Sequence, residues 1–302
     1  MEKIQELAVP RLLSELVVEN RVLIGAIQAT VGEWVRIGPG HIRLAAKMVS
    51  FDEIFILRFV LSNQGESVAE IIRKVQETLE WRGEHLGLLS QVAEGSCEML
   101  RPANEYFCRA YVGDYGGHCF FMERNGHHDF PRLQQLLKFY SSEDSAISFS
   151  DAILLSNEVF FRKTDSLSRR INRLSTAISL HFLDNVSMIP TPSVMKAVHA
   201  TGLASKKSSI YYPQLVGAGV LFSSQSLVIR FVLKISKTVI SEKAMSKVVV
   251  CPGFRKDVPP SACPALRRLD PTLDWTQVFP TCANGTAKMP ASLRSKMYDE
   301  EE

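Results

Sequence analysis

Histidines and cysteines are the side chains in this sequence best suited to catalysis. The 302 residues include seven histidines and six cysteines, and one of each stands together at His118-Cys119. A nucleophilic thiol needs an imidazole base within hydrogen-bond reach. Consecutive residues on a strand point to opposite faces, so this pair should not meet as nucleophile and base. The sequence therefore predicts no catalytic residue and no enzymatic activity.

The same residue types do not predict a metal site or a cofactor. The sequence has no Cys-x-x-Cys pair, and His127-His128 has no third ligand at metal-binding spacing. The glycines at 113–117 and 217–219 lack the pattern of a phosphate-binding loop. We therefore expect reduced cysteines, no metal and no cofactor.

Composition narrows the class of protein. The 35 basic and 32 acidic side chains are too balanced for a protein held on nucleic acid by its overall charge. No apolar stretch reaches the length of about 18 residues that a membrane span needs, and the charged start MEKIQELAVPRLL does not resemble a signal peptide. We expect a cytoplasmic, monomeric protein without a nucleic-acid partner.

Cations line one side of an unusually apolar helix predicted over 226–241. Its polar positions, Ser226, Arg230, Lys234, Lys237 and Ser241, span an arc of only about 80°. The remaining surface is apolar and exceeds what one packing partner needs. Two interpretations fit: a crossover helix buried between a sheet and another helix, or the wall of a cavity.

A second basic group follows a helix predicted over 150–163. It consists of Arg162, Lys163, Arg169, Arg170 and Arg173. A solvated cluster at the end of a helix is the commoner explanation for such a group, and contact with a membrane or an acidic partner is the alternative.

Helices and strands are predicted in two successive regions. The first hundred residues are helical, with a helix at 51–61 and another that begins at the capping box Ser67-x-x-Glu70 and ends at Gly83. Strands at 119–122, 176–183, 215–222 and 246–250 then alternate with helices, which predicts a largely parallel sheet. We expect a helical region at 1–98, an α/β domain at 99–285 and an acidic mobile tail at 286–302.

These segments resemble the CRAL-TRIO family of lipid-binding proteins, including the phosphatidylinositol-transfer type. Residues 51–82, with Ile56-Leu57-Arg58-Phe59 and Trp81-Arg82, are similar to its helical N-terminal region. The second half of the family pattern is similar to Tyr211-Tyr212-Pro213-Gln214, the strand and apolar helix that follow, and the strand after Lys247. The resemblance covers roughly residues 50–285 and implies a helical region followed by a mostly parallel, helix-flanked sheet that encloses an apolar pocket.

The resemblance implies that one lipid or similar apolar molecule occupies the pocket and that the helix at 226–240 is a lid that opens at membranes. The implied ligand-binding residues are Lys247, Gln214, Tyr212, Leu180, Phe222, Phe231, Leu233 and Val250. The implied membrane-facing residues are Arg230, Lys234 and Lys237, which suit anionic headgroups.

Two departures from the family pattern bear on the ligand. Ser62-Asn63-Gln64-Gly65 stands where phosphatidylinositol-binding members carry a basic element, and Gln214 replaces the glutamate that pairs with the lysine matched by Lys247. An amide holds a lysine less strongly than a carboxylate does. The resemblance therefore leaves the cargo open between phosphatidylinositol and another apolar molecule. The alternative is a lipid-independent module that binds a small GTPase or another signalling protein.

Overall fold

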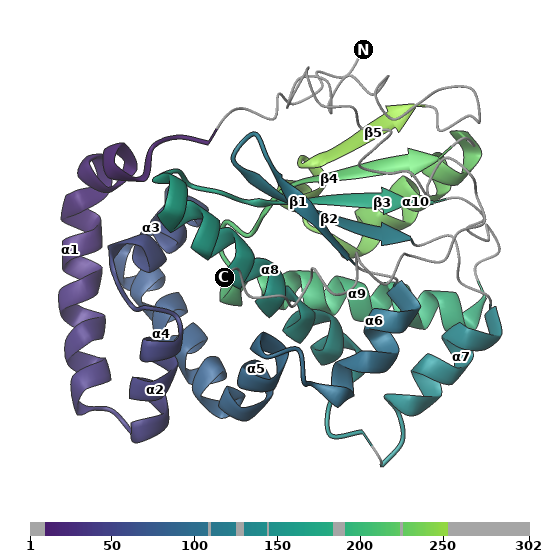
Figure 1. The fold of residues 1–302 in the computed structure, drawn as a ribbon, viewed down its shortest axis with the longest axis horizontal. Helices are drawn as coiled ribbons and strands as arrows, with labels where there is room; N and C mark the ends of the chain where they lie inside the picture. Colours follow the sequence, from purple (N-terminus) through teal and green to yellow (C-terminus); the bar gives the residue numbers. More distant parts are fainter. Residues whose placement is uncertain are drawn as a thin grey trace.

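The N-terminal region is entirely helical. The computed structural model describes residues 10–107, 110–124, 130–143, 145–183, 191–223 and 226–252. Its first helices are α1 (Leu13–Ile37), α2 (Gly40–Met48), α3 (Glu53–Ser62), α4 (Val68–Glu84), α5 (Leu86–Ala93), the short 3₁₀ helix η1 (Glu98–Leu100) and α6 (Arg101–Phe107). Helices α1 to α5 gather on one side of the molecule, with α1 at its edge (Figure 1).

Local capping explains where two of these helices begin. The carboxylate of Asp52 accepts hydrogen bonds from the backbone N–H groups of Ile54 and Phe55 at the start of α3. Ser67 Oγ accepts from Glu70 N at the start of α4, as the capping box predicts.

Gly83 does not end α4, contrary to the prediction, because the helix continues through it to Glu84. A Cβ atom at position 83 would lie 2.6 Å from His41 Cδ2 on α2, so a glycine lets the two helices approach closely.

A five-stranded sheet forms the other half of the molecule. Its order is β1 (Ala110–Tyr115), β2 (His118–Arg124), β3 (Ala177–Phe182), β4 (Val216–Ser223) and β5 (Val248–Pro252). Strands β1 and β2 form an antiparallel hairpin, and β2 to β5 pair in parallel. The largely parallel sheet is thus confirmed, while β1, which no predicted strand covers, adds the hairpin.

Five further helices lie among the parallel strands in the described part of the chain. They are α7 (Phe130–Phe139), α8 (Phe149–Ile171), α9 (Pro192–Tyr211), α10 (Ser226–Val239) and α11 (Glu242–Met245). Helix α8 packs on β2 and β3, α10 packs on β4, and α9 packs against both helices. Helix α8 also contacts α5, so it separates the sheet from the N-terminal helices (Figure 1).

The two faces of the sheet differ in their neighbours. Phe121 on β2 packs against Phe160 of α8, with ring centroids 3.9 Å apart and the rings tilted by 33°, and Leu233 of α10 packs against the cluster that contains Leu221 on β4. We call this side the helical face. Strand alternation turns the neighbouring residues to the opposite face, where Phe120 and Val220 are fully buried.

Candidate functional site

Helix α10 turns its cations to solvent and its apolar side to the sheet. Arg230, Lys234 and Lys237 are all exposed. Leu233 and Val232 pack against the cluster of Leu183 and Leu221, which Val248 of β5 also packs against. A buried crossover helix and the wall of a cavity would both contact the sheet in this way. The three exposed cations agree with the narrow polar arc predicted from the sequence.

Two further apolar residues of α10, Phe231 and Leu227, differ in their exposure to solvent. Phe231 is half-buried, whereas Leu227 in the first turn is 62% exposed. An exposed leucine beside a cationic stripe gives the start of α10 an amphipathic outer surface.

The helical face of the sheet carries polar groups next to its apolar ones. His181 Nδ1 on β3 lies 3.3 Å from Glu123 Oε2 on β2. Gly219 of β4 lies beside the His181 ring, because a Cβ at position 219 would come within 3.8 Å of Nε2. Val250 on β5 pairs in register with Leu221, so its side chain lies on the helical face, which α10 contacts through Leu233.

Two of the predicted ligand-binding residues lie on the opposite face. Leu180 is level with Met122 on β2 and Val220 on β4, and Phe222 is two residues after Val220. Both side chains are fully buried. Alternation along the strands therefore places Leu180 and Phe222 on the face of the sheet away from α10, the predicted lid.

Lys247 and Gln214 lie at the edge of the sheet where β4 and β5 begin. The Lys247 ammonium donates a hydrogen bond of 2.5 Å to the backbone carbonyl of Val216. Burial, with the nearby Lys243 charge, lowers the pKa of Lys247. Gln214 has a φ of 56°, in the left-handed region, and the N–H of Leu215 donates to the carbonyl of Tyr212. Gln214 therefore shapes the turn that leads into β4.

A second lysine ties α11 to the N-terminal helices. The Lys243 ammonium donates to the carbonyl of Ser62, the last residue of α3. Helix α3 has no basic side chain in its own last turn. A cation near unpaired C-terminal carbonyls is favourable, so Lys243 supplies from a distant segment the charge that α3 lacks.

Tyr212 lies in a buried cluster between α4 and α8. The Arg82 guanidinium lies over the Tyr212 ring, 5.1 Å from its centroid, and over the Phe161 ring, 4.9 Å from its centroid. Arg82 Nη2 is 2.9 Å from Glu158 Oε2, and both side chains are fully buried. Tyr212 therefore packs on the ion pair that joins the N-terminal helices to α8.

The charges in this cluster hold each other ionised. Burial disfavours the ionised form of Glu158, but Arg82 and Arg162 outweigh it and lower the Glu158 pKa. Burial likewise disfavours the charged Arg82, and the Glu158 carboxylate outweighs it and raises the Arg82 pKa. Burial and the Glu158 charge together raise the pKa of the Tyr212 hydroxyl well above its ordinary value. The cluster is thus a neutral tyrosine beside a buried ion pair.

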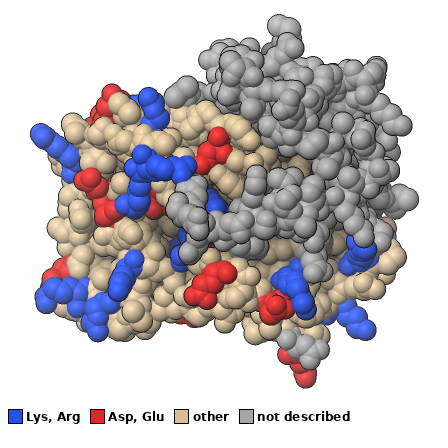
Figure 2. All heavy atoms as spheres, in the orientation of Figure 1, with Lys and Arg blue, Asp and Glu red and all other residues tan. Residues whose placement is uncertain are grey.

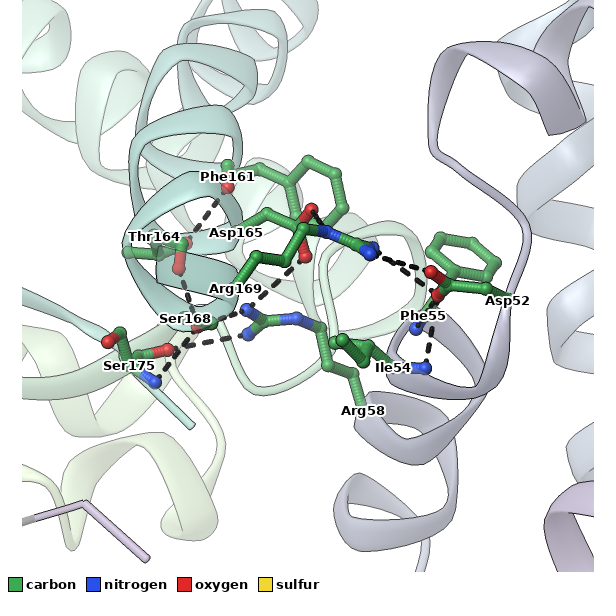
Figure 3. Close-up of polar contacts among 10 residues, drawn as sticks. All are labelled: Asp52, Ile54, Phe55, Arg58, Phe161, Thr164, Asp165, Ser168, Arg169 and Ser175. Atoms are coloured by element: carbon green, nitrogen blue, oxygen red, sulfur yellow. Dashed lines mark hydrogen bonds and ion pairs between the residues drawn. The ribbon is translucent and has the colours of Figure 1, made fainter. Parts of the chain in front are cut away.

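Arg58 forms a second buried link between the same regions (Figure 3). Its Nη2 donates to Ser168 Oγ at 3.0 Å and its Nη1 to the Ser175 carbonyl at 3.5 Å. Asp165 Oδ1 is 3.6 Å from Nη2. Burial lowers the Arg58 pKa, and the Asp165 carboxylate opposes this shift.

The start of α3 is fixed to α8 beside this link. Arg169 of α8 donates to Asp165 at 2.7 Å and to Asp52 at 2.6 Å. Asp52 is also the residue that caps α3, so one carboxylate both begins a helix and docks it. Sequence reasoning did not predict either buried arginine link, because the partners are distant in the chain.

His118 and Cys119 point to opposite faces, as strand alternation predicts. His118 Nδ1 is 2.9 Å from Thr176 Oγ1, and burial raises the Cys119 pKa far above its ordinary value. Across the described residues, histidine, cysteine and carboxylate side chains do not gather in a group of three that could bind a metal. None of the helices described is both long and apolar enough to span a bilayer.

Comparison of the sequence with known protein families and with curated proteins finds no match. Among solved structures, the fold is similar to the crystal structure of Sfh5, with a TM-score of 0.50 and 15% sequence identity over 79% of each chain. Sfh5 is a Sec14-like, or CRAL-TRIO, protein. The similarity confirms the predicted fold class, a helical region followed by a helix-flanked, mostly parallel sheet.

Proposed function

We propose that this protein binds one lipid or other small apolar molecule against the helical face of its sheet and presents it at membranes. Helix α10 serves as the lid, and Leu233, Phe231 and Val250 contact the ligand. The proposal includes no enzymatic step. It describes a cytoplasmic monomer that associates with membranes only at their surface.

The single observation that carries the proposal is the arrangement of α10 on a Sec14-like scaffold. Its apolar side lies on the sheet through Leu233, while Arg230, Lys234 and Lys237 are exposed. A lid must contact an apolar ligand when closed and anionic headgroups when open. A narrow basic stripe on an otherwise apolar helix meets both requirements.

Lys247 is the residue proposed to select an anionic headgroup. Its ammonium is half-buried at the edge of β5 and donates to a backbone carbonyl, not to a carboxylate. A ligand phosphate would offer it a stronger, charge-assisted hydrogen bond. Gln214 shapes the adjoining turn and is uncharged, so Lys247 and not Gln214 supplies charge to this part of the proposed site.

The first test is the content of the purified protein. Extraction of the full-length protein, followed by mass spectrometry, should yield about one apolar molecule per chain, because a closed lid retains its cargo. Protein that carries no lipid and takes none up from vesicles would contradict the proposal. That result would favour the alternative, a lipid-independent module for a signalling protein.

The second test is transfer of lipid between vesicles. Leu233→Asp places a charge against the cluster of Leu183 and Leu221 and should reduce transfer at least tenfold, because burial of an unpaired carboxylate is strongly unfavourable. Leu233→Met, which keeps an apolar side chain at the same position, is the matched control and should leave transfer nearly unchanged. Circular dichroism checks that both variants fold, and equal transfer by Leu233→Asp and the wild type would exclude α10 as the lid.

A third test concerns the headgroup. Lys247→Met keeps the length of the side chain and removes its charge. It should weaken binding of anionic lipids while leaving neutral lipids nearly unchanged. An equal loss for both lipid classes would assign Lys247 to packing instead.

A further inference from the structure

Helices α9 and α10 are the two longest of the described helices that lack acidic side chains. Neither contains an aspartate or a glutamate. The two helices pack against each other. Among the described cations, those that form neither an ion pair nor a hydrogen bond with another described residue are Lys196, Lys206, Arg230, Lys234 and Lys237 on these helices, and Arg21, Lys47 and Lys138 elsewhere.

Exposed apolar residues accompany these cations on α9 as well as on α10. Met195 is 43% exposed and Leu203 is 41% exposed. Together with His199 and Lys206 they recur at helical spacing and occupy an arc of about 80° on the outside of α9. Of the other large exposed apolar residues, Leu227 lies on α10, Leu44 lies on α2, and the rest lie on α1, which also carries acidic side chains.

Within the part of the chain that the structure describes, one cation of α9 has a carboxylate partner. The Lys207 ammonium donates to Asp151 at the start of α8, at 2.8 Å. Lys196 and Lys206 are exposed instead. The outer stripe of α9 therefore offers positive charge and apolar side chains without a neutralising acid on the same helix.

We propose that α9 is a second membrane-contact element and that it docks, together with α10, on bilayers containing anionic lipid. Basic side chains at a bilayer surface are attracted by its negative potential, and exposed apolar side chains enter the boundary between headgroups and acyl chains. Met195 and Leu203 are the inserted residues, and Lys196 and Lys206 meet the headgroups. This inference rests on the proposed membrane function but concerns a helix that the function does not require.

The experiment measures binding of the full-length protein to two kinds of vesicle, phosphatidylcholine alone and phosphatidylcholine mixed with phosphatidylserine. The double variant Lys196→Gln/Lys206→Gln should bind the mixed vesicles roughly 25-fold more weakly than the wild type. Raising the salt concentration should reduce this difference, because exposed charges are screened.

The matched control is Lys47→Gln/Lys138→Gln, which removes two exposed lysines from α2 and α7. It changes the net charge by the same amount and should leave vesicle binding within about twofold of the wild type. Equal losses in both double variants would show that net charge alone drives binding and would overturn the assignment of α9. Unchanged binding by the α9 variant would overturn it as well.

A second pair of variants tests insertion. Met195→Gln/Leu203→Gln should weaken vesicle binding several-fold, whereas Val18→Gln/Val22→Gln on α1 should not, although Val18 and Val22 are more exposed. Both pairs should retain the co-purifying ligand. Loss of membrane binding with the ligand retained supports the role of α9, whereas wild-type protein without any ligand contradicts the proposed function independently.

Discussion

The cations of α8 and those of α10 are used in opposite ways. Each basic residue in the second half of α8, or just after it, has a partner in the fold: Arg162 with Glu158, Lys163 with the Tyr111 ring, Arg169 with Asp52 and Asp165, Arg170 with Asp114, and Arg173 with the Pro10 carbonyl. The three cations of α10 are exposed and form no ion pair within the described part of the chain.

This difference separates a helix that joins two regions from one that faces outward. Helix α8 lies between the sheet and the N-terminal helices, so its charges are satisfied by side chains on both sides. Figure 2, which shows one face of the molecule, has blue and red side chains interspersed over the side where the N-terminal helices lie. Charges without acidic neighbours remain available for a ligand or a membrane.

The largest expected effect comes from breaking the buried ion pair of α8. Glu158→Gln leaves the buried Arg82 guanidinium without its counter-charge. Loss of one partner of a buried pair typically lowers the free energy of unfolding by about 3–5 kcal/mol. Urea denaturation measures this decrease in the free energy of unfolding. Glu33→Gln, which breaks an exposed pair with Arg36 on α1, should change stability little, and similar losses in the two variants would contradict the comparison.

A decrease in pH tests the contribution of the buried Glu158 charge to stability in a second way. The Glu158 pKa is lowered in the folded protein, mainly because Arg82 and Arg162 offset burial. Its stabilising contribution is therefore present above the ordinary value of 4.5 and is lost as the pH falls through the lower, folded-state pKa. The stability difference between wild type and Glu158→Gln should narrow below pH 4.5, as urea titrations at several pH values would show. A constant difference would mean that Glu158 acts through packing.

A smaller effect is expected at the start of α3. Asp52→Ala removes the helix cap and the partner of Arg169, and should lower the free energy of unfolding by about 1–2 kcal/mol. Asp52→Asn keeps an oxygen for the cap but removes the charge, so it should recover part of the loss. Equal destabilisation by both variants would assign the whole effect to the ion pair.

The smallest effect concerns Tyr212. Its buried hydroxyl has no hydrogen-bond partner within the described structure. Tyr212→Phe keeps the ring beside Arg82 and should change the free energy of unfolding by less than about 1 kcal/mol. Its ligand content should equal that of the wild type. Loss of ligand in this variant would restore Tyr212 to the binding site and contradict its placement in the α8 cluster.

Local sequence signals predicted the features of the fold that depend on near neighbours. The cap at Ser67 follows from residues within one turn, and the parallel strands β2 to β5 follow from short apolar runs separated by helices. The amphipathic pattern of α10 likewise predicted which side of the helix is exposed. The predicted boundary at 98 remains a prediction, and the segment 286–302 lies outside the described residues.

Long-range contacts decided what the sequence could not predict. Glycine is typical of helix ends, but Gly83 lies within α4, where the lack of a side chain allows His41 of α2 to approach closely. Leu180 and Phe222 are as apolar as residues of a ligand pocket, yet only the pairing of β2, β3 and β4 shows which face they occupy. Arg82 and Glu158 meet across helices that are far apart in the chain.

The contact between Lys243 and the end of α3 has a mechanical consequence. It holds the segment that follows α10, and Lys247 is held next to it. Two residues separate the end of β4 at Ser223 from the start of α10 at Ser226, so both ends of this helix are tied to the fold. Its 14 residues span about 20 Å between the two attachments. Under the proposed function, a lid held at both ends would open by a short outward shift and not by a wide swing.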